Sequence, residues 1–324
     1  MKKLFIMLAA AATVASCANE ETVMEAPGQA IEFGAPFVDN ATRAADPSYS
    51  ANDITAFKVY GIVNDVNILD GDNVTKTADY GSAWTLTDAE TGQDLKLYWI
   101  PGASYKFVGI VDGDKTGVTK TNVENKMPLS VEYTADGATD LLCKTIEMTA
   151  RTDGQPNGLV EFGFTHLLSK VNFTVINDSK DAVGNSFVVK NITFNGATKA
   201  TYDVVNKEWE TATATGNTVL GNERTVGGSP VKDIVVATGA ASAELGTEVL
   251  FIPGEYSISF TVDILYNGEV ITSTNYNGYT HTLNANNAYN FKVNVSVGEL
   301  IQFSVEKQPS WLDGDGADDT TLTL

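Results

Sequence analysis

Alternation of apolar and polar residues is the feature of this sequence that most restricts its fold. In the stretch YNFKVNVSV, every second residue from Tyr289 to Val297 is apolar and the residues between them are polar or charged. The stretches SISFTVDILY (257–266) and SKVNFTV (169–175) repeat the pattern. Because side chains alternate across a strand with a period of two, these segments are predicted as half-buried strands of antiparallel sheets.

Shorter strand candidates fill the space between these long ones, with Gly, Asn and Asp marking the turns. They are Phe57–Val63, Leu95–Trp99, Tyr105–Val111, Phe187–Phe194, Ile234–Ala237 and Ile301–Val305. We find no convincing amphipathic helix after the first residues, and apolar residues make up 43% of the chain, enough for a sizeable core. Many short strands with this composition predict β-sandwiches.

A short sequence motif that occurs twice, which we call the internal echo, favours two such sandwiches. YWIPGASYKF begins at Tyr98 and LFIPGEYSISF begins at Leu250, so an aromatic residue, Ile, Pro and Gly precede an alternating strand twice. Pro followed by Gly predicts a type II turn at both places. A chance match is the alternative. If the echo reflects a shared strand plan, the boundary between the domains lies near residues 150 to 170.

The first residues are typical of a bacterial export signal. Lys2 and Lys3 precede a short apolar run from Leu4 to Val14, which is too short to span a membrane. The run ends in Val-Ala-Ser-Cys, which resembles a lipobox and predicts a lipid on Cys17. An ordinary cleaved signal peptide with an incidental cysteine is the alternative. The sequence therefore predicts a chain anchored in a membrane rather than spanning it.

Residues 18 to 53 differ from the rest of the chain, because their first part, ANEETVMEAPGQ, has no period and is acidic, which is typical of a tether. Within them, AIEFGAPFV offers one isolated apolar strand with Ile31, Phe33 and Phe37. The following stretch, DNATRAADPSYSAND, is typical of an exposed loop, where proteolytic nicking is favoured. Arg43, followed by Ala44, is its only basic residue. An ordinary solvated linker charge is the alternative interpretation of Arg43.

Charge and motif content argue against several function classes. The net charge of −20 disfavours nucleic-acid binding, and no phosphate-binding loop, nucleophile elbow or paired metal-ligand motif is present. The two histidines, His166 and His281, are predicted in a core strand and a hairpin. The acidic stretch LDGDGADD near the C-terminus fits a solvated loop better than a calcium site. We therefore predict no enzyme, no cofactor and no metal.

Several stretches together resemble the fimbrillin family of Bacteroidetes, the Mfa-like subunits of type V pili and related surface lipoproteins. They are the lipobox ending at Cys17, ATRA (41–44), YWIPGASYKF, FTHLLSKVNFTV (164–175) and the C-terminal YNFKVNVSVGELIQFSVEKQPSWLDG. The resemblance spans nearly the whole chain.

This resemblance implies two tandem transthyretin-like antiparallel β-sandwiches. We place a signal peptide at 1–16, a leader with one strand at 17–43, and the two domains at 44–165 and 166–324. The resemblance also implies that an arginine-specific protease cuts between Arg43 and Ala44. That cut would release the lipid and the strand carrying Ile31, Phe33 and Phe37, and so open a groove. Other fimbrial subunits are then the expected partners, because a C-terminal strand of one subunit fills the groove of the next.

Two C-terminal segments are candidate donor strands. They contain Ile301, Phe303 and Val305 in the first case, and Leu322 and Leu324 in the second. The expected product is a surface fimbria that contributes to adhesion to a host protein or glycan, with the precursor held in the outer membrane through Cys17. The competing hypothesis is a monomeric surface lipoprotein that binds glycan, for which exposed tryptophans would supply a stacking platform. The sequence leaves open whether the subunit is a stalk, an anchor or a tip.

Overall fold

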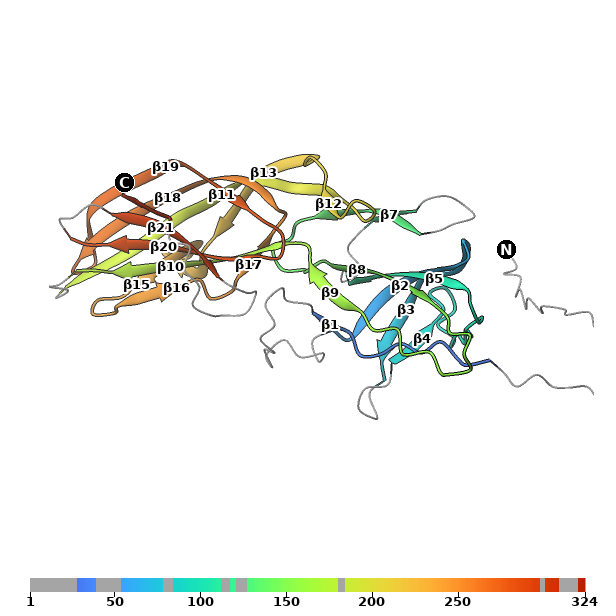
Figure 1. Ribbon diagram of the computed structural model, residues 1–324. Helices are drawn as coiled ribbons and strands as arrows, with labels where there is room; N and C mark the ends of the chain where they lie inside the picture. Colours follow the sequence, from blue (N-terminus) through green and yellow to red (C-terminus); the bar gives the residue numbers. More distant parts are fainter. Residues whose placement is uncertain are drawn as a thin grey trace, which may run out of the picture.

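The computed structural model describes residues 28–38, 54–77, 84–111, 117–120, 127–179, 184–297, 301–308 and 320–323. These residues form 22 strands and no helix, which confirms the predicted all-β fold (Figure 1). In this described part, no helix is long and apolar enough to cross a membrane.

The first sheet has seven strands in the order β1-β9-β8-β5-β2-β3-β4. Their bounds are β1 (Phe37–Val38), β2 (Ala56–Val63), β3 (Val66–Lys76), β4 (Trp84–Thr87), β5 (Ser104–Val111), β8 (Leu142–Thr149) and β9 (Gly163–His166). Neighbouring strands are antiparallel except β1 and β9, which run parallel. A parallel pair at the end of an antiparallel sheet sets β1 apart from the other strands.

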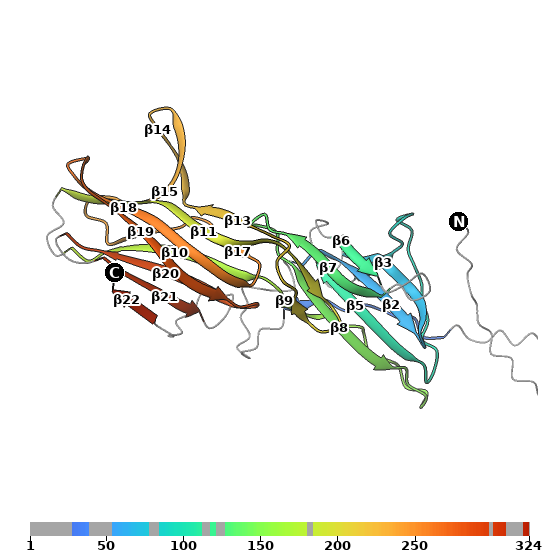
Figure 2. The ribbon, with the colours of Figure 1, turned by 90° about the horizontal axis from the view of Figure 1, so that it is seen from above.

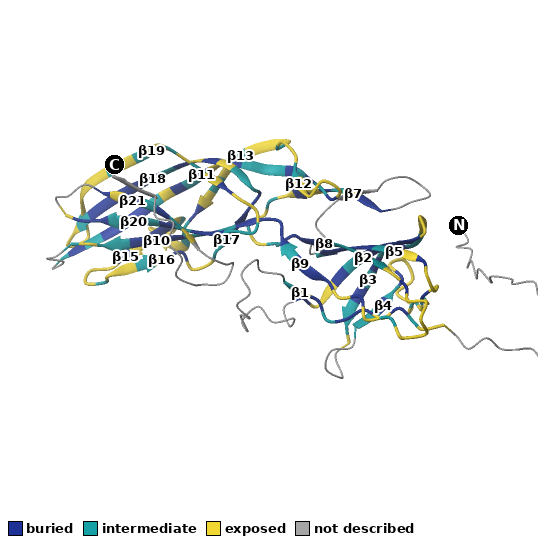
Figure 3. Cartoon of the chain, viewed as in Figure 1, coloured by how far each residue is buried: buried dark blue, intermediate teal, exposed yellow. Residues whose placement is uncertain are grey.

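The second sheet has nine strands, with the path β14-β15-β11-β18-β19 and four further strands paired beside it. Their bounds are β6 (Gly117–Lys120), β7 (Pro128–Thr134), β11 (Asn185–Asp203), β12 (Glu208–Trp209), β13 (Ala214–Leu220), β14 (Asn222–Val226), β15 (Ser229–Val236), β18 (Gly254–Tyr266) and β19 (Glu269–Leu283). The outer strand β19 is largely exposed (Figure 3).

The third sheet has six strands, in the order β16-β10-β20-β21-β22, with β17 also paired to β10. Their bounds are β10 (Ser169–Asn177), β16 (Ser242–Glu244), β17 (Val249–Phe251), β20 (Ala288–Val295), β21 (Gln302–Gln308) and β22 (Thr320–Thr323). Strand β22 lies at the edge and pairs only with β21 among the described strands.

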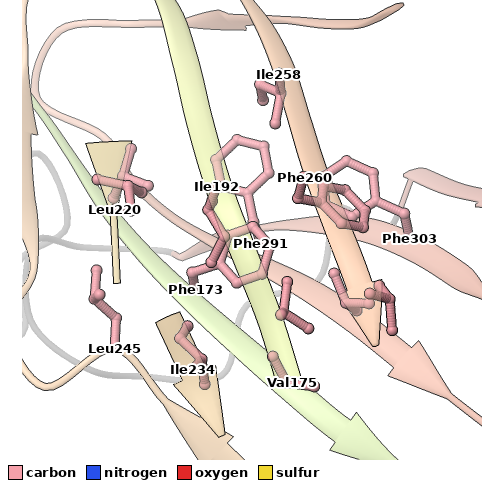
Figure 4. Close-up of a cluster of buried hydrophobic side chains, with 14 of the residues drawn as sticks. Phe173, Val175, Ile192, Leu220, Ile234, Leu245, Ile258, Phe260, Phe291 and Phe303 are labelled. Atoms are coloured by element: carbon pink, nitrogen blue, oxygen red, sulfur yellow. The ribbon is translucent and has the colours of Figure 1, made fainter. Parts of the chain in front are cut away.

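Three clusters of buried side chains hold these sheets together. One lies on one face of the seven-stranded sheet and includes Phe57, Phe107 and Phe164. The second lies on the opposite face of that sheet and joins Tyr60 and Val108 to side chains of β7 and β11. The third joins the six-stranded sheet to the nine-stranded sheet (Figure 4). Its large members include Phe173, Phe194, Phe260, Phe291 and Phe303.

Strand β11 connects the two halves of the molecule. Its first part pairs with β15 and β18, and its last part pairs with β7 through Lys199–Asp203. Figure 2 shows β11 running from the C-terminal sandwich toward β7. A strand of the predicted C-terminal domain is therefore hydrogen-bonded to a strand of the predicted N-terminal domain. The boundary at residues 165 and 166 stays a prediction.

The internal echo corresponds to similar local packing in both halves. Trp99 packs edge-on against Tyr105, and Phe251 packs edge-on against Tyr256, with ring centroids 4.7 and 5.2 Å apart. The first predicted turn is present, because Ala103 N–H donates to the Ile100 carbonyl and Gly102 has a φ of 75°. The second predicted turn is wrong, because β18 begins directly at Gly254 and pairs there with β19.

Candidate functional site

Residues 28–38, which we call the leader strand, lie in a slot between two extended segments that flank the seven-stranded sheet. The first wall of the slot is residues 97–99, where Ala30 pairs with Tyr98 in antiparallel fashion. Ile31 N–H donates to the Leu97 carbonyl at 2.8 Å, and Trp99 N–H donates to the Gln29 carbonyl at 2.9 Å. The predicted strand at Leu95–Trp99 thus serves as an extended wall, with isolated bridges in place of a regular strand.

The second wall is residues 157–164, which run parallel to the leader strand. Val160 N–H donates to the Glu32 carbonyl at 2.9 Å, and Gly34 N–H donates to the Val160 carbonyl at 3.0 Å. Further along, Phe37 N–H donates to the Phe162 carbonyl at 3.0 Å, and β1 continues the pairing along β9. Since the first wall is linked to β4 by the bond from Leu95 N–H to the Leu86 carbonyl, the leader strand joins the two ends of the sheet.

Two leader side chains enter the core of this sheet. Ile31 and Phe33 are 7% and 5% exposed. The Phe33 ring packs against three others, those of Phe57, Phe107 and Phe162, at centroid distances of 6.4, 6.0 and 6.4 Å. The leader strand therefore contributes an aromatic side chain to the centre of a core built by the residues that follow it.

The apolar alternation of the leader strand ends after Phe33. Phe37 pairs with Gly163 through the backbone, but its side chain is 47% exposed. Gly34, Ala35 and Pro36 lie between them, and Pro36 has no N–H to donate to a ladder. At Gly34 the leader strand lies against the Glu161 side chain, since an added Cβ would lie 2.6 Å from Glu161 Cγ. Ile31 and Phe33 are therefore the anchoring side chains.

The other predicted processing residues, Cys17, Arg43 and Ala44, lie outside the described residues. The lipid and the cut stay predictions. The described structure does establish that the leader strand and the next described residue, Ile54, are separated by the stretch that contains Arg43.

The two candidate donor strands occupy different environments. Ile301, Phe303 and Val305 lie at the start of or within β21 and are buried in the C-terminal core. The Phe303 ring lies 4.9 Å from Tyr279. It also lies 5.2 Å from Phe260 and 5.9 Å from Phe291, which Figure 4 labels. Leu322 lies on the edge strand β22, and Leu324 lies outside the described residues.

The groups considered for catalysis or metal binding are dispersed. His166 is fully buried on β9, as predicted, and its Nδ1 pairs with Asp140 at 2.5 Å. His281 lies on β19 among the rings of Tyr289 and Phe291, and burial lowers its pKa. Within the described ranges, no group of three or more His, Cys, Asp or Glu side chains could hold a metal ion. The acidic stretch 313–319 lies outside those ranges.

The tryptophans proposed as a glycan platform pack into the protein where they are described. Trp99 is 4% exposed, and Trp84 packs against Phe57 at 5.8 Å. Trp209 packs against Tyr202 at 5.5 Å and donates its indole N–H to the Leu167 carbonyl. Trp311 lies outside the described residues.

The sequence matches a known protein family over most of its length. A sequence model described as fimbrillin-like matches residues 42–309, more than four fifths of the 324 residues. The chain belongs to the fimbrillin-like family. Membership confirms the resemblance noted in the sequence and places the chain among structural, fimbrial proteins of the cell surface.

A solved fimbrial protein shows the same fold at low sequence identity, and the chain is also similar to two further solved structures. A fimbrial protein from Bacteroides vulgatus matches with a TM-score of 0.59 and 14% identity, covering 88% of this fimbrillin-like chain and 100% of its own. A proposed cell adhesion protein from Bacteroides ovatus gives 0.50 and 14%, covering 89% and 99%. The fimbrial anchor protein Mfa2 from Porphyromonas gingivalis gives 0.38 and 11%, covering 86% and 96%. No curated protein matches the sequence.

The pairing of the two walls with the leader strand was not predicted from the sequence. One signal was present, because Val160-Glu161-Phe162-Gly163 nearly repeats Ile31-Glu32-Phe33-Gly34 of the leader strand. The two stretches lie side by side in the structure, and the Phe33 and Phe162 rings are stacked.

Proposed function

We propose that this chain is the lipoprotein precursor of a structural subunit of surface fimbriae of the type V kind. It would be exported to the outer membrane through a lipid on Cys17 and processed by an arginine-specific protease between Arg43 and Ala44. A C-terminal strand of another fimbrial subunit would then take the place of the leader strand. The fimbria formed in this way would contribute to adhesion to a host protein or glycan.

One observation carries this proposal: a core position of the first sheet is filled by a segment on the far side of the predicted cut. Burying a side chain such as Ile31 or Phe33 contributes about 1.5–3 kcal/mol. Losing the leader strand would also leave the backbone groups of both walls without their partners. An emptied slot therefore favours any strand that can supply two alternate apolar side chains and a ladder of hydrogen bonds.

The two candidate donors differ in what their transfer would cost. Ile301, Phe303 and Val305 are already buried in their own core, so moving β21 exchanges one apolar site for another with little net gain. Strand β22 lies at an edge and pairs with β21 through residues 320–323 alone. We therefore propose that β22 and the residues beside it transfer first, with Leu322 and Leu324 in the sites of Ile31 and Phe33.

Mass spectrometry of the surface-exposed protein tests the proposal. An N-terminus at Ala44 in assembled material, with Arg43→Ala blocking both processing and polymerisation, is the expected result. Normal polymers formed by Arg43→Ala with an intact leader would contradict it. Arg151→Ala is a matched control, because Arg151 lies outside the leader and its ion pair with Asp153 is exposed on both sides, so its loss should cost little stability.

A further inference from the structure

Gln29, at the start of the leader strand, contacts both walls of the slot, the first through its backbone and the second through its side chain. The Gln29 carbonyl accepts from Trp99 N–H on the first wall. On the second wall, Gln29 Oε1 accepts from the backbone N–H of Asn157 at 2.5 Å and from its Nδ2 at 3.1 Å, while Gln29 Nε2 donates to the Asn157 carbonyl at 2.8 Å. One leader residue thus makes three hydrogen bonds to a single wall residue.

Asn157 also organises the loop that leads into the second wall. Its Oδ1 accepts from the backbone N–H of Arg151 at 2.8 Å, which closes residues 151–157 into a compact loop. Within that loop, Asp153 accepts from Arg151 Nε at 3.0 Å and from Gln155 N–H at 3.1 Å. Asn157 is therefore held in position from the loop side while it contacts the leader strand.

The contact differs in kind from the other hydrogen bonds between the leader strand and its walls. Those described above join backbone to backbone, and any strand can make them whatever its sequence. The three bonds to Asn157 need a side chain that both donates and accepts and that has the length of glutamine. This contact can therefore distinguish one strand from another.

The C-terminal half has a similar side-chain hydrogen bond at the position that corresponds to Gln29. Ser169 lies two residues before the buried Val171, as Gln29 lies two residues before Ile31. Ser169 Oγ donates to the Asn284 carbonyl at 2.8 Å, in the loop that leads into the parallel strand β20. A side-chain bond at this position thus occurs in both halves of the protein.

We propose that Asn157 is a clamp that retains the chain's own leader strand in the slot and discriminates it from a replacing strand. The discrimination rests on the proposed strand replacement, whereas the retention does not. Glu299 precedes Ile301 by two residues and Thr320 precedes Leu322 by two. A glutamate has no N–H to give to the Asn157 carbonyl, and a threonine side chain is too short to reproduce the glutamine contacts. The clamp therefore holds a cut leader but gives no help to the incoming strand.

Release of the cut leader tests the retention. The full chain receives a unique protease site between residues 39 and 53 and a fluorescent label before Gln29, and the label is followed after cutting and dilution. Gln29→Ala removes all three bonds, and we expect it to speed release about tenfold, as for the loss of one to two hydrogen bonds. Asn157→Ala removes only the bond from Nδ2 to Gln29 and the loop bond to Arg151, so it should speed release by a smaller factor. The double variant should be no faster than Gln29→Ala alone. Asp153→Asn, which alters the loop but keeps the contact between Gln29 and Asn157, should release at the original rate.

Peptide binding to the emptied slot tests the discrimination. Asn157→Ala should weaken binding of a peptide of residues 28–38 by a factor of a few, because it removes one of the three bonds to Gln29. It should leave peptides of residues 299–308 and 318–324 unaffected. Unchanged release rates, multiplicative effects in the double variant, or equal weakening of all three peptides would overturn the clamp. Because Gln29→Ala changes only the leader, it keeps the test valid if Asn157→Ala fails to fold. Failure of both C-terminal peptides to bind would count against the proposed function, while the release rates still decide the retention.

Discussion

The leader strand and strand β10 occupy corresponding places in the two halves of the molecule. The leader strand is antiparallel to residues 97–99 and parallel to β9. Strand β10 is antiparallel to β17 and parallel to β20. Both wall segments, 97–99 and β17, precede the repeated Ile-Pro-Gly, and both inserted strands bury an aliphatic residue followed two positions later by Phe33 or Phe173.

The difference between the two strands lies in how firmly each is joined to its half. Strand β10 pairs with β20 through eight consecutive residues, 170–177. The leader strand has isolated bridges at Ala30 and Phe33 and a two-residue strand at its end, and residues 39–53 separate it from the rest of its half. The same architecture therefore has a separable strand in one half and an integral strand in the other.

The largest effect should come from removing the leader strand. Loss of the Ile31 and Phe33 side chains alone should lower the unfolding free energy of the N-terminal half by about 3–6 kcal/mol. Urea unfolding followed by fluorescence measures this, since Trp99 lies in that core next to the leader strand. The C-terminal half should unfold at its original urea concentration. Equal stability with and without the leader strand would show that the two halves do not differ in the way described.

Truncating the two corresponding phenylalanines should give a smaller and more selective difference. Phe173→Ala should lower the stability of the C-terminal half by about 3–5 kcal/mol, because Phe173 is fully buried in an integral strand. Phe33→Ala should mainly raise the fraction of molecules with an undocked leader and leave the remaining fold intact. Hydrogen exchange of the leader amides separates the two results. Global destabilisation by Phe33→Ala equal to that of Phe173→Ala would contradict the comparison.

A side chain at Gly34 should weaken the leader strand by about 1–3 kcal/mol through crowding. The reason is local, since a Cβ at this position meets the Glu161 side chain. Gly34→Val should therefore increase leader exchange, and the added change Glu161→Gly should restore much of the protection. If Glu161→Gly gives no rescue, crowding at this contact is the wrong explanation.

The smallest of the four effects should be that of acid on the unfolding free energy of the C-terminal half. Burial lowers the pKa of His281 below its ordinary value of 6.5, so the unfolded chain binds a proton more readily than the folded one. The contribution of neutral His281 is then fully present above about pH 6.5 and is lost as the pH falls toward the folded pKa. His281→Gln should flatten the pH dependence of urea unfolding of this half. A pH dependence identical to that of the original chain would exclude His281 as its source.

The sequence predicted the separable strand better than it predicted the slot. Ile31 and Phe33 alternate with polar neighbours, so the strand could be identified locally. Its walls depend on pairing between segments more than 60 residues apart in the case of Leu97 and more than 120 in the case of Val160, and no local pattern specifies such a register. Gln29 and Asn157 were missed because a surface amide pair has no recognisable spacing.

The length of strand β11 depends on its partner strand more than on its own sequence. The apolar pattern predicted Phe187–Phe194, whereas β11 continues to Asp203. Its last part, which includes Ala200 and Tyr202, is rich in polar residues because only one of its faces is buried. Pairing with β7 rather than intrinsic propensity extends the strand there.

Hydrogen exchange at the two pairs of walls tests the central claim most directly. The amides of Trp99 and Val160, which donate to the leader strand, should be protected in the full chain, lose protection when the cut leader strand is separated, and regain it on polymerisation. Amides of β17 and β20 should stay protected throughout, because β10 remains in place. Walls that stay protected without any strand in the slot would contradict the account.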